Sequence, residues 1–357
     1  MVSRIDTRSG ETRRALMPIA GHAIAVAPGG AEALWVGMND PVLLRFATDS
    51  LDVLGMAAPH AEGFVFGGHA VYPAGRGIAF VSERRDTGLR FTGSHEDHHG
   101  RISVRDPVTL AVLDVWSCHG IAPHDLTLTV DGRYLVIANY GSTAWPDGQD
   151  APAPGIGYGV EPCVTVLDAT DGTLVAKLPG THRTHEVRHV AAHRLDRIVG
   201  LPVRVTSFDD AQRRLAALNE IYDIDHSERE GLGYLPVPVL LGDGTNGTIA
   251  ELPPDGLRMI RGQSIVADPM HDEAIATFTS SNTLVVIGGD GRLRTIIETD
   301  RLGLRWPRGI CLMPDDETYA VAGDWENIFI FRRGSHTLVR EASVYETLFG
   351  HSHIAAF

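Results

Sequence analysis

The segment PHDLTLTVDGRYLVIAN, residues Pro123–Asn139, contains the pattern that decides the fold. A polar residue, His124, begins an apolar strand, which ends at an Asp-Gly turn and is followed by a second apolar strand. Asp-Gly between two such runs predicts a tight β-hairpin. A titratable imidazole at the head of an apolar strand is unusual for a core, so its position calls for a reason beyond packing.

The same pattern recurs along the chain, which indicates an internal repeat. Clear copies are GHAIAVAPGGAEALWVG from Gly21, GHAVYPAGRGIAFVS from Gly68 and PRGICLMPDDETYAVAG from Pro307, and weaker copies start at Arg188 and Gly262. Each copy is followed by another pair of short strands around a turn. Four short strands per unit, with Gly and Asp at the turns, are typical of a propeller blade.

The two ends of the chain complement each other. HSHIAAF (351–357) reads as a first strand without a successor, and VSRIDTRSGETRRALMP (2–18) reads as a third and fourth strand without a predecessor. We therefore predict one all-β domain over residues 1–357, a seven-bladed β-propeller in which the N-terminal strands pair with the C-terminal strand. Such closure removes exposed sheet edges.

A polar residue heads each predicted innermost strand, and these positions are 45 to 74 residues apart. Innermost strands run parallel around the central channel, so we expect the side chains at these positions to converge on the axis. In chain order they are His22, His69, His124, His189, Gln263, Arg308 and His353.

Five imidazoles at one point predict a metal centre, because imidazole is the commonest metal-binding side chain. Without cysteine and with little carboxylate, they suit iron(II) or copper, with zinc as a third candidate. We expect three or four of His22, His69, His124, His189 and His353 to bind the ion and the rest to hold water or substrate. A channel whose polar side chains only hydrogen-bond water is the alternative.

Further polar residues surround this predicted centre. Gln263 and Arg308 are candidates for binding substrate, and Glu186 could orient the imidazole of His189 or be a surface carboxylate. The loop GSHEDHHG, with His95, His98 and His99, could be a second metal site or a solvated polar loop. His193, His271 and His336 are expected on the opposite face.

Three long insertions are predicted on the face where the innermost strands enter, at about 84–100, 140–161 and 204–235. Long loops on a rigid scaffold are commonly functional, and these would form a lid over His69, His124 and His189. The third insertion contains the one predicted helix, SFDDAQRRLAALNEIY, where Ser207 and Asp210 have capping-box spacing.

Composition excludes several classes of partner. The formal net charge of −14 disfavours nucleic acid, whose phosphates need clustered Lys and Arg. No apolar run approaches the roughly 18–20 residues that span a bilayer, and the polar start of the chain shows no secretory signal, so we expect a cytoplasmic location. Cys118, Cys163 and Cys311 lie far apart in the sequence and predict neither a disulfide framework nor a thiol nucleophile.

The strings GHAVYP, HGIAPHDL, DGRYLVIANYG, EPCVTVLDATDGTL and VRHVA resemble the bacterial propeller family known as domain of unknown function 1513. Members of that family are usually exported and are often encoded beside iron-uptake components. The resemblance therefore implies a role near iron or copper. This chain differs by its longer insertions and by the absence of a visible export signal.

Together these observations favour a metal-dependent oxidoreductase, with non-haem iron or copper, that acts on a small molecule beneath the lid. Two alternatives remain open. One is a metal-binding or delivery protein without turnover, and the other is an interaction scaffold that binds a protein partner on its top face.

Overall fold

The computed structural model describes residues 1–38, 40–86, 94–141, 161–180, 185–204, 240–242, 247–249, 259–323, 327–344 and 353–357. Within these residues almost all regular structure is β-strand. The helical segments among them are three short 3-10 turns, η1 (His95–His98), η3 (Asp300–Leu302) and η4 (Arg340–Ala342). None of the described helices has the length and apolar character needed to cross a bilayer.

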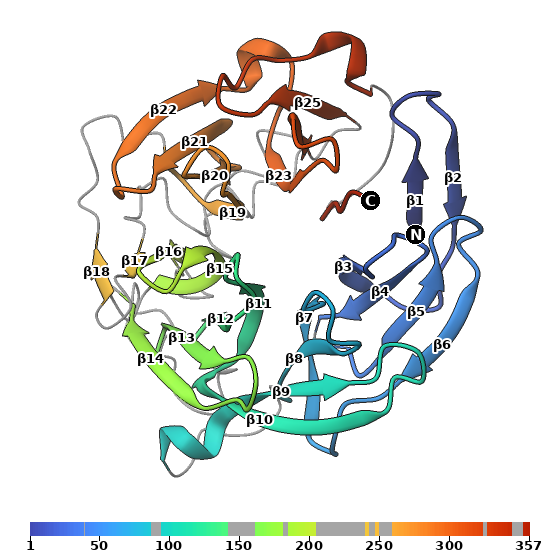
Figure 1. The fold of residues 1–357 in the computed structure, drawn as a ribbon, viewed down its shortest axis with the longest axis vertical. Coiled ribbons are helices and arrows are strands. Elements are labelled where there is room, and N and C mark those ends of the chain that lie inside the picture. Colours follow the sequence, from blue (N-terminus) through green and yellow to red (C-terminus); the bar gives the residue numbers. More distant parts are fainter. Residues whose placement is uncertain are drawn as a thin grey trace, which may run out of the picture.

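Six antiparallel sheets follow one another around a central axis, as expected for a propeller (Figure 1). The first blade consists of β3 (Gly21–Val26), β4 (Glu32–Gly37), β5 (Leu43–Ala47) and β6 (Val53–Ala57). The second consists of β7 (Phe64–Val71), β8 (Ala79–Arg85), β9 (His99–Arg105) and β10 (Val112–Ile121). The third consists of β11 (Pro123–Leu128), β12 (Tyr134–Asn139), β13 (Cys163–Asp168) and β14 (Leu174–Pro179).

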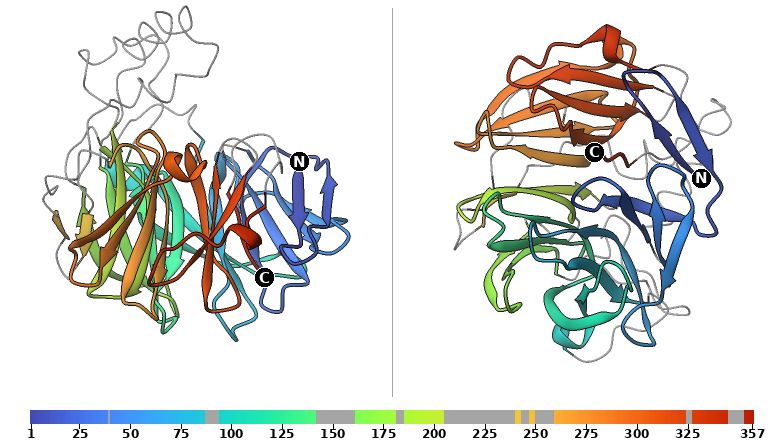
Figure 2. Two further views of the ribbon diagram at one scale, coloured as in Figure 1. Left: turned by 90° about the horizontal axis from the view of Figure 1, so that it is seen from above. Right: turned by 45° about the vertical axis from the view of Figure 1, so that its right-hand side comes forward.

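The remaining blades continue the circle, and their strands stand steeply to its plane when it is seen from the side (Figure 2). The fourth blade consists of β15 (His185–Arg194), β16 (Arg197–Arg204), β17 (Leu240–Gly242) and β18 (Gly247–Ile249). The fifth consists of β19 (Gly262–Asp268), β20 (Glu273–Phe278), β21 (Thr283–Gly288) and β22 (Leu293–Glu298). The sixth consists of β23 (Pro307–Leu312), β24 (Thr318–Gly323) and β25 (Ile328–Arg332).

The sixth blade differs from the sequence prediction, which gave it a fourth strand. Beside β25 the described residues form two isolated bridges, Phe331 with Leu338 and Ile328 with Val344, separated by η4. The side chain of Ser343 explains the interruption, because its hydroxyl accepts the backbone N–H of Ile330 at 3.1 Å. A side chain thus takes a hydrogen bond that a fourth strand would otherwise receive.

The apolar core lies between consecutive blades. Each pair of neighbouring sheets shares one buried cluster, such as Leu34 of the first blade with Phe66 of the second, or Ile275 of the fifth with Phe329 of the sixth. Burying a side chain of this size contributes roughly 1.5–3 kcal/mol. Apolar contacts between the faces of neighbouring sheets therefore hold the blades together. The innermost strands are not needed for this packing at the axis and can carry polar side chains there.

The two chain ends lie beside the first blade. β1 (Val2–Ile5) and β2 (Thr12–Ala15) form a two-stranded sheet, and Val2 packs against Trp35 and Phe46. Residues 353–357 adopt no regular strand and lie near the axis, inside β3 and β23 (Figure 1). The all-β propeller is thus confirmed, but the described residues form six blades of three or four strands and not the predicted seven. Among these residues β1 pairs only with β2, so the predicted pairing of the N-terminal strands with the C-terminal strand stays a prediction.

Most of the predicted insertions lie outside the described residues, at 87–93, 142–160 and 205–239. The helix predicted from Ser207 also lies outside them. The end of the first insertion is described, where the hydroxyl and the backbone N–H of Ser94 both donate to Asp97 at the start of η1, at 3.0 and 2.8 Å.

Candidate metal centre

Each of the six innermost strands breaks its register with the second strand of its blade at or next to the predicted axial residue. A β-bulge of this kind re-aims a side chain and releases it from the regular alternation. The breaks occur at Gly21/Ala23, Phe66/Ala70, Pro123/Leu126, Val187/His189, Gly262/Ser264 and Pro307/Ile310. The repeated bulge is the local reason that polar side chains from different blades can turn toward the axis.

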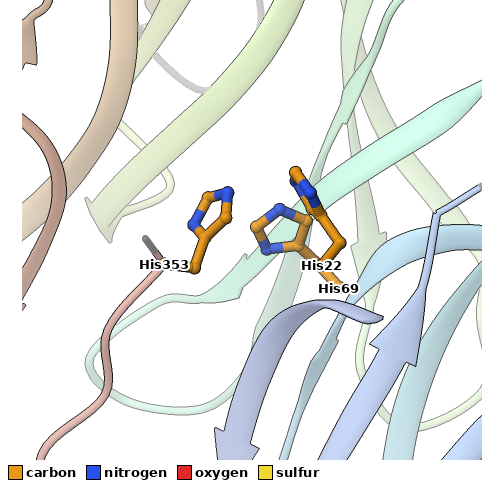
Figure 3. A group of neighbouring side chains, drawn as sticks. All are labelled: His22, His69 and His353. Carbon is orange, nitrogen blue, oxygen red and sulfur yellow. The ribbon is translucent and has the colours of Figure 1, made fainter. Parts of the chain in front are cut away.

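The five predicted histidines come together there. Contacting imidazole rings have centroids 4.3 Å apart at the closest, for His22 and His353, and 5.7 Å apart at the widest, for His189 and His353. Figure 3 shows His22 and His69 beside each other, with His353 opposite them on the C-terminal segment. His124 completes the group through contacts with His22 at 4.9 Å and His69 at 4.6 Å.

Two sets of three histidines have ligand atoms close enough to share an ion. In His22, His69 and His353 the three nitrogen atoms lie within 4.8 Å of one another, and the same holds for His69, His124 and His189. The histidine groups could therefore hold a metal ion. His69 belongs to both sets, and it is the point where the two sides of the group meet.

Asp125 orients two of these imidazoles from behind. Its carboxylate lies 3.1 Å from Nδ1 of His69 and 3.4 Å from Nδ1 of His189, and it also accepts the backbone N–H of Val190 at 3.1 Å. Nδ1 of His124 donates to the carbonyl oxygen of Gly67 at 2.6 Å. In all three histidines Nε2 is left as the ligand atom, an arrangement common in metal sites.

The electrostatics of the group favour neutral imidazoles. Burial, together with the neighbouring imidazoles of His69 and His189, lowers the pKa of His22 to about 2. Burial is also the main reason that the pKa values of His124, His189 and His353 are lowered. Neutral imidazole is the form that binds metal, so these four histidines are ready for an ion at neutral pH.

Unlike the neutral imidazoles, the carboxyl of Asp125 is charged. Burial disfavours its charged form, but the imidazoles of His69 and His189 outweigh burial and hold its pKa far below the usual range. Asp125 is therefore an anion that accepts hydrogen from both Nδ1 atoms. It fixes their tautomers and makes Nε2 more basic.

Unsatisfied nitrogen atoms point to a missing ligand. Nε2 of His22 and Nε2 of His69 are buried and have no hydrogen-bond partner. A buried polar atom without a partner costs about 1–3 kcal/mol. An ion shared by these nitrogens would remove that cost, so the residues present fit a bound transition metal.

Gln263 and Arg308 occupy the corresponding bulges of the fifth and sixth blades. Nε2 of Gln263 is buried without a hydrogen bond, and the charge of Arg308 contributes to lowering the pKa of His22. The backbone at Arg308 is held by the Thr277 hydroxyl, which donates to its carbonyl oxygen at 2.8 Å. Both side chains thus belong to the polar ring at the axis.

Glu186, which could orient the imidazole of His189 or be a surface carboxylate, is buried. Its carboxylate forms an ion pair with Arg188 at 2.9 Å. The carboxylate that contacts the imidazoles is Asp125, which the sequence interpretation missed. A signal was present, because Asp125 directly follows His124, whereas Ala23, Ala70 and Val190 follow the axial histidines of the other blades.

The histidines of the HEDHH loop do not join this centre in the described residues. His98 and His99 are 8% and 7% exposed, whereas Ser94, Glu96 and Asp97 just before them are exposed. His99 lies 3.5 Å from Glu161. The side chain of His95 lies outside the described residues, and metal binding by this loop stays an open hypothesis.

His193, His271 and His336 lie in or beside the turns at the other ends of their strands, where they surround two buried carboxylates. His336 lies 3.3 Å from the carboxylate of Glu273, and Nε2 of His193 donates to the Glu273 carbonyl oxygen at 2.7 Å. Nδ1 of His271 is 3.0 Å from Asp268. Asp268, His271 and Glu273 also have metal-ligand spacing.

The contact of Arg333 with Asp268 indicates a structural role for the group of Asp268, His271 and Glu273. The Arg333 guanidinium donates to both carboxylate oxygens of Asp268, at 2.9 and 2.5 Å. A carboxylate already neutralised by a buried guanidinium is a poor ligand for a cation. We therefore interpret the group as a link between the fifth and sixth blades.

Cys118 and Cys163 are buried thiols, and Cys311 is partly buried. Burial raises the pKa of Cys118 and of Cys311 to about 12, and it raises the pKa of Cys163 as well. A reactive cysteine needs a lowered pKa. These cysteines thus behave as small apolar side chains.

We compared the chain with known protein families, curated proteins and solved structures. No curated protein matches the chain. Among solved structures, hydrazine synthase of Kuenenia stuttgartiensis has a similar fold, with a TM-score of 0.60, 13% identity, and coverage of 93% of this chain and 89% of that chain. At this identity the likeness concerns the fold alone. The family described as "Protein of unknown function (DUF1513)" matches residues 15–222, which is more than half of the chain, and the protein belongs to that family.

Proposed function

We propose that the five-histidine centre binds a redox-active transition metal, iron or copper, and that the protein is an oxidoreductase acting on a small molecule at this centre. The observation that carries the proposal is the convergence of five imidazoles, four of them with lowered pKa values. Two of the five, the imidazoles of His69 and His189, lie beside the partly buried carboxylate of Asp125. An all-imidazole donor set suits iron, copper or zinc and disfavours calcium and magnesium.

The five histidines would have different roles in binding the ion. His69, His124 and His189 are the most buried of the five and have oriented Nδ1 atoms, so they are the best candidates for permanent ligands. His22 and His353 would complete the shell or contact the substrate. A bound iron or copper ion would supply one-electron redox chemistry and Lewis acidity.

The other axial residues would position the substrate. We assign Gln263 and Arg308 to substrate binding, because an amide and a guanidinium beside neutral imidazoles offer hydrogen-bond donors to an oxygen-rich or anionic molecule. The insertions at about 84–100, 140–161 and 204–235 would cover the centre and exclude water.

Burial favours a resident ion over a cargo ion. His124 is 1% exposed and His189 is 3% exposed. A delivery protein must release its metal to a partner, which is easier from an exposed site. Delivery without turnover is therefore the second candidate.

Metal analysis of the untagged protein, after anaerobic incubation with iron(II) or with copper, tests the first step. We expect about one equivalent in the wild type and a large loss in His124→Ala, with the fold retained by circular dichroism. His271→Ala is the matched control and should keep its metal. Occupancy below about a tenth of an equivalent in the wild type would refute the proposal, and loss only in His271→Ala would move the metal to the opposite face.

Turnover separates the two candidates. Oxygen consumption by the metal-loaded protein with a panel of small molecules should exceed that of His124→Ala. Metal transfer to a chelator within seconds, with no substrate-dependent oxygen consumption, would favour delivery.

We also propose that residues 1–357 form a single domain in which the N-terminal sheet and the C-terminal segment complete a seventh blade. Two contacts support this: Val2 packs on the first blade, and His353 reaches His22 at the axis. Removing residues 353–357 should then lower both the free energy of unfolding and the affinity for metal. A truncated protein as stable as the full chain would contradict the closure.

A further inference from the structure

A buried guanidinium beside the histidine centre forms no close ion pair with a carboxylate of the described residues, although Glu186 and Asp86 lie near enough to act on its charge. Arg84, at the end of β8, is 4% exposed, and its Nε forms no hydrogen bond. Its guanidinium carbon lies 5.9 Å from the centroid of the Tyr140 ring. An uncompensated buried charge costs several kcal/mol.

Arg105, another buried arginine, shows how the fold can pair a guanidinium with its own groups. Arg105 is 1% exposed, and its guanidinium donates to Glu83 at 2.8 Å and to the carbonyl oxygens of Ala58 and Leu110. The fold can therefore satisfy a buried guanidinium fully with its own groups. At Arg84 no described residue accepts a hydrogen bond from Nε, which leaves this donor available to a bound anion.

A second guanidinium faces the same aromatic ring. The guanidinium carbon of Arg188 lies 5.3 Å from the centroid of Tyr140. Arg188 also pairs with Glu186 at 2.9 Å. The carboxylates of Asp86 and Asp125 lie farther off and act on Arg84 and on Tyr140, respectively. Burial raises the pKa of Tyr140 to about 12, so its hydroxyl stays neutral.

The cluster adjoins the histidine centre directly. The ring of Tyr140 packs on the imidazole of His124, with centroids 4.8 Å apart. Arg188 immediately precedes His189 on β15. An anion held by the arginines would therefore lie next to the His124 side of the centre.

We propose that Arg84, with Arg188, forms a subsite for the anionic group of the substrate, a carboxylate or a phosphate, beside His124. Guanidinium groups bind both anions through paired N–H donors. This deepens the proposed function, because it restricts the substrate to small molecules that carry such a group and fixes the end that points away from the metal.

Anion binding to the metal-free protein tests the subsite separately from the metal. Calorimetric titration with inorganic phosphate and with acetate, in chloride-free buffer, should give saturable binding of at least one of them to the wild type. Arg84→Gln should weaken that binding by at least about tenfold, and Arg84→Lys should retain part of it. Phosphate alone would identify a phosphate ester, and acetate alone a carboxylate.

A matched control is available in Arg133, which stacks on Tyr134 at 5.0 Å on the surface. Arg133→Gln should leave anion binding unchanged. The melting temperature distinguishes a ligand site from a structural role, since Arg84→Gln removes a buried charge without a close ion pair and should melt no lower than the wild type without anion. No saturable binding by the wild type, or equal binding by Arg84→Gln, would overturn the subsite even if the protein binds metal.

Discussion

The two nitrogen atoms of each axial imidazole have separate roles. In His69, His124 and His189, Nδ1 is engaged by Asp125 or by the Gly67 carbonyl oxygen, and Nε2 is left to bind. One carboxylate therefore fixes imidazoles from two different blades. This makes Asp125 the residue on which the geometry of the centre most depends.

Asp125→Asn should weaken metal binding by about 10–100-fold, because an amide cannot stabilise the N–H groups of both imidazoles as a carboxylate does. The fold should survive, since the amide oxygen can still accept the Val190 N–H. Competition with a chelator of known affinity measures the effect. Asp131→Asn, in an exposed hairpin turn, is the control, and equal affinity in the two variants would exclude a role for Asp125.

At the level of single elements, the bulge in each innermost strand turns a polar side chain toward the axis. The repeated strand thereby contributes one residue to the shared site. The bulge of β7 depends on Gly68, whose φ of +111° is rarely adopted by other residues. A Cβ at this position would lie 2.9 Å from Cδ2 of His22 and 3.1 Å from Cε1 of His124. The strand thus needs glycine both for its conformation and for the packing of the imidazoles.

Gly68→Ala should lower metal affinity by at least about tenfold, because the new methyl group displaces two imidazoles. It should also cost about 1–3 kcal/mol of stability from backbone strain. Gly75→Ala is the matched control, since Gly75 has a φ of +70° and nothing within 4 Å of the added Cβ. If both variants keep wild-type metal affinity, the bulge does not position the ligands.

At the scale of the whole molecule, buried ion pairs supplement the apolar contacts that hold the blades together. Asp268 of the fifth blade is fully buried, and Arg333, after β25 in the sixth, binds both of its oxygens. Breaking such a pair by removing one partner typically costs about 3–5 kcal/mol. The link lies away from the axial centre, so it bears on stability and not on metal binding.

Asp268→Asn should destabilise the protein by about that amount at pH 7 without changing metal affinity. Despite burial, Arg333 and His271 lower the pKa of Asp268 to about 2, below its value in the unfolded chain. The stabilisation is therefore complete above about pH 4 and is lost as the pH falls toward 2.

Urea unfolding of wild type and variant between pH 7 and pH 3 tests this. The exposed pair of Arg194 and Asp196 supplies the control, because Asp196→Asn should change stability little at any pH. A stability difference that stays constant down to pH 3 would contradict the assignment.

The repeat made the propeller and its axial histidines predictable, because a polar residue at the head of an apolar strand is a local signal. Asp125 was missed because its role depends on His69 and His189 from other blades. The subsite of Arg84 and Tyr140 was missed for the same reason. The interrupted strand of the sixth blade was mispredicted, because its sequence, TLVREA, is compatible with a strand and only the contact of Ser343 with Ile330 reveals the break.

The most direct test is an anomalous-difference map from crystals loaded anaerobically with iron(II) or copper, measured at the absorption edge of that metal. We predict one strong peak on the propeller axis, about 2.0–2.1 Å from nitrogen atoms of at least three of the five histidines. No peak at the axis, or a peak only beside Asp268 and His271, would contradict the metal centre.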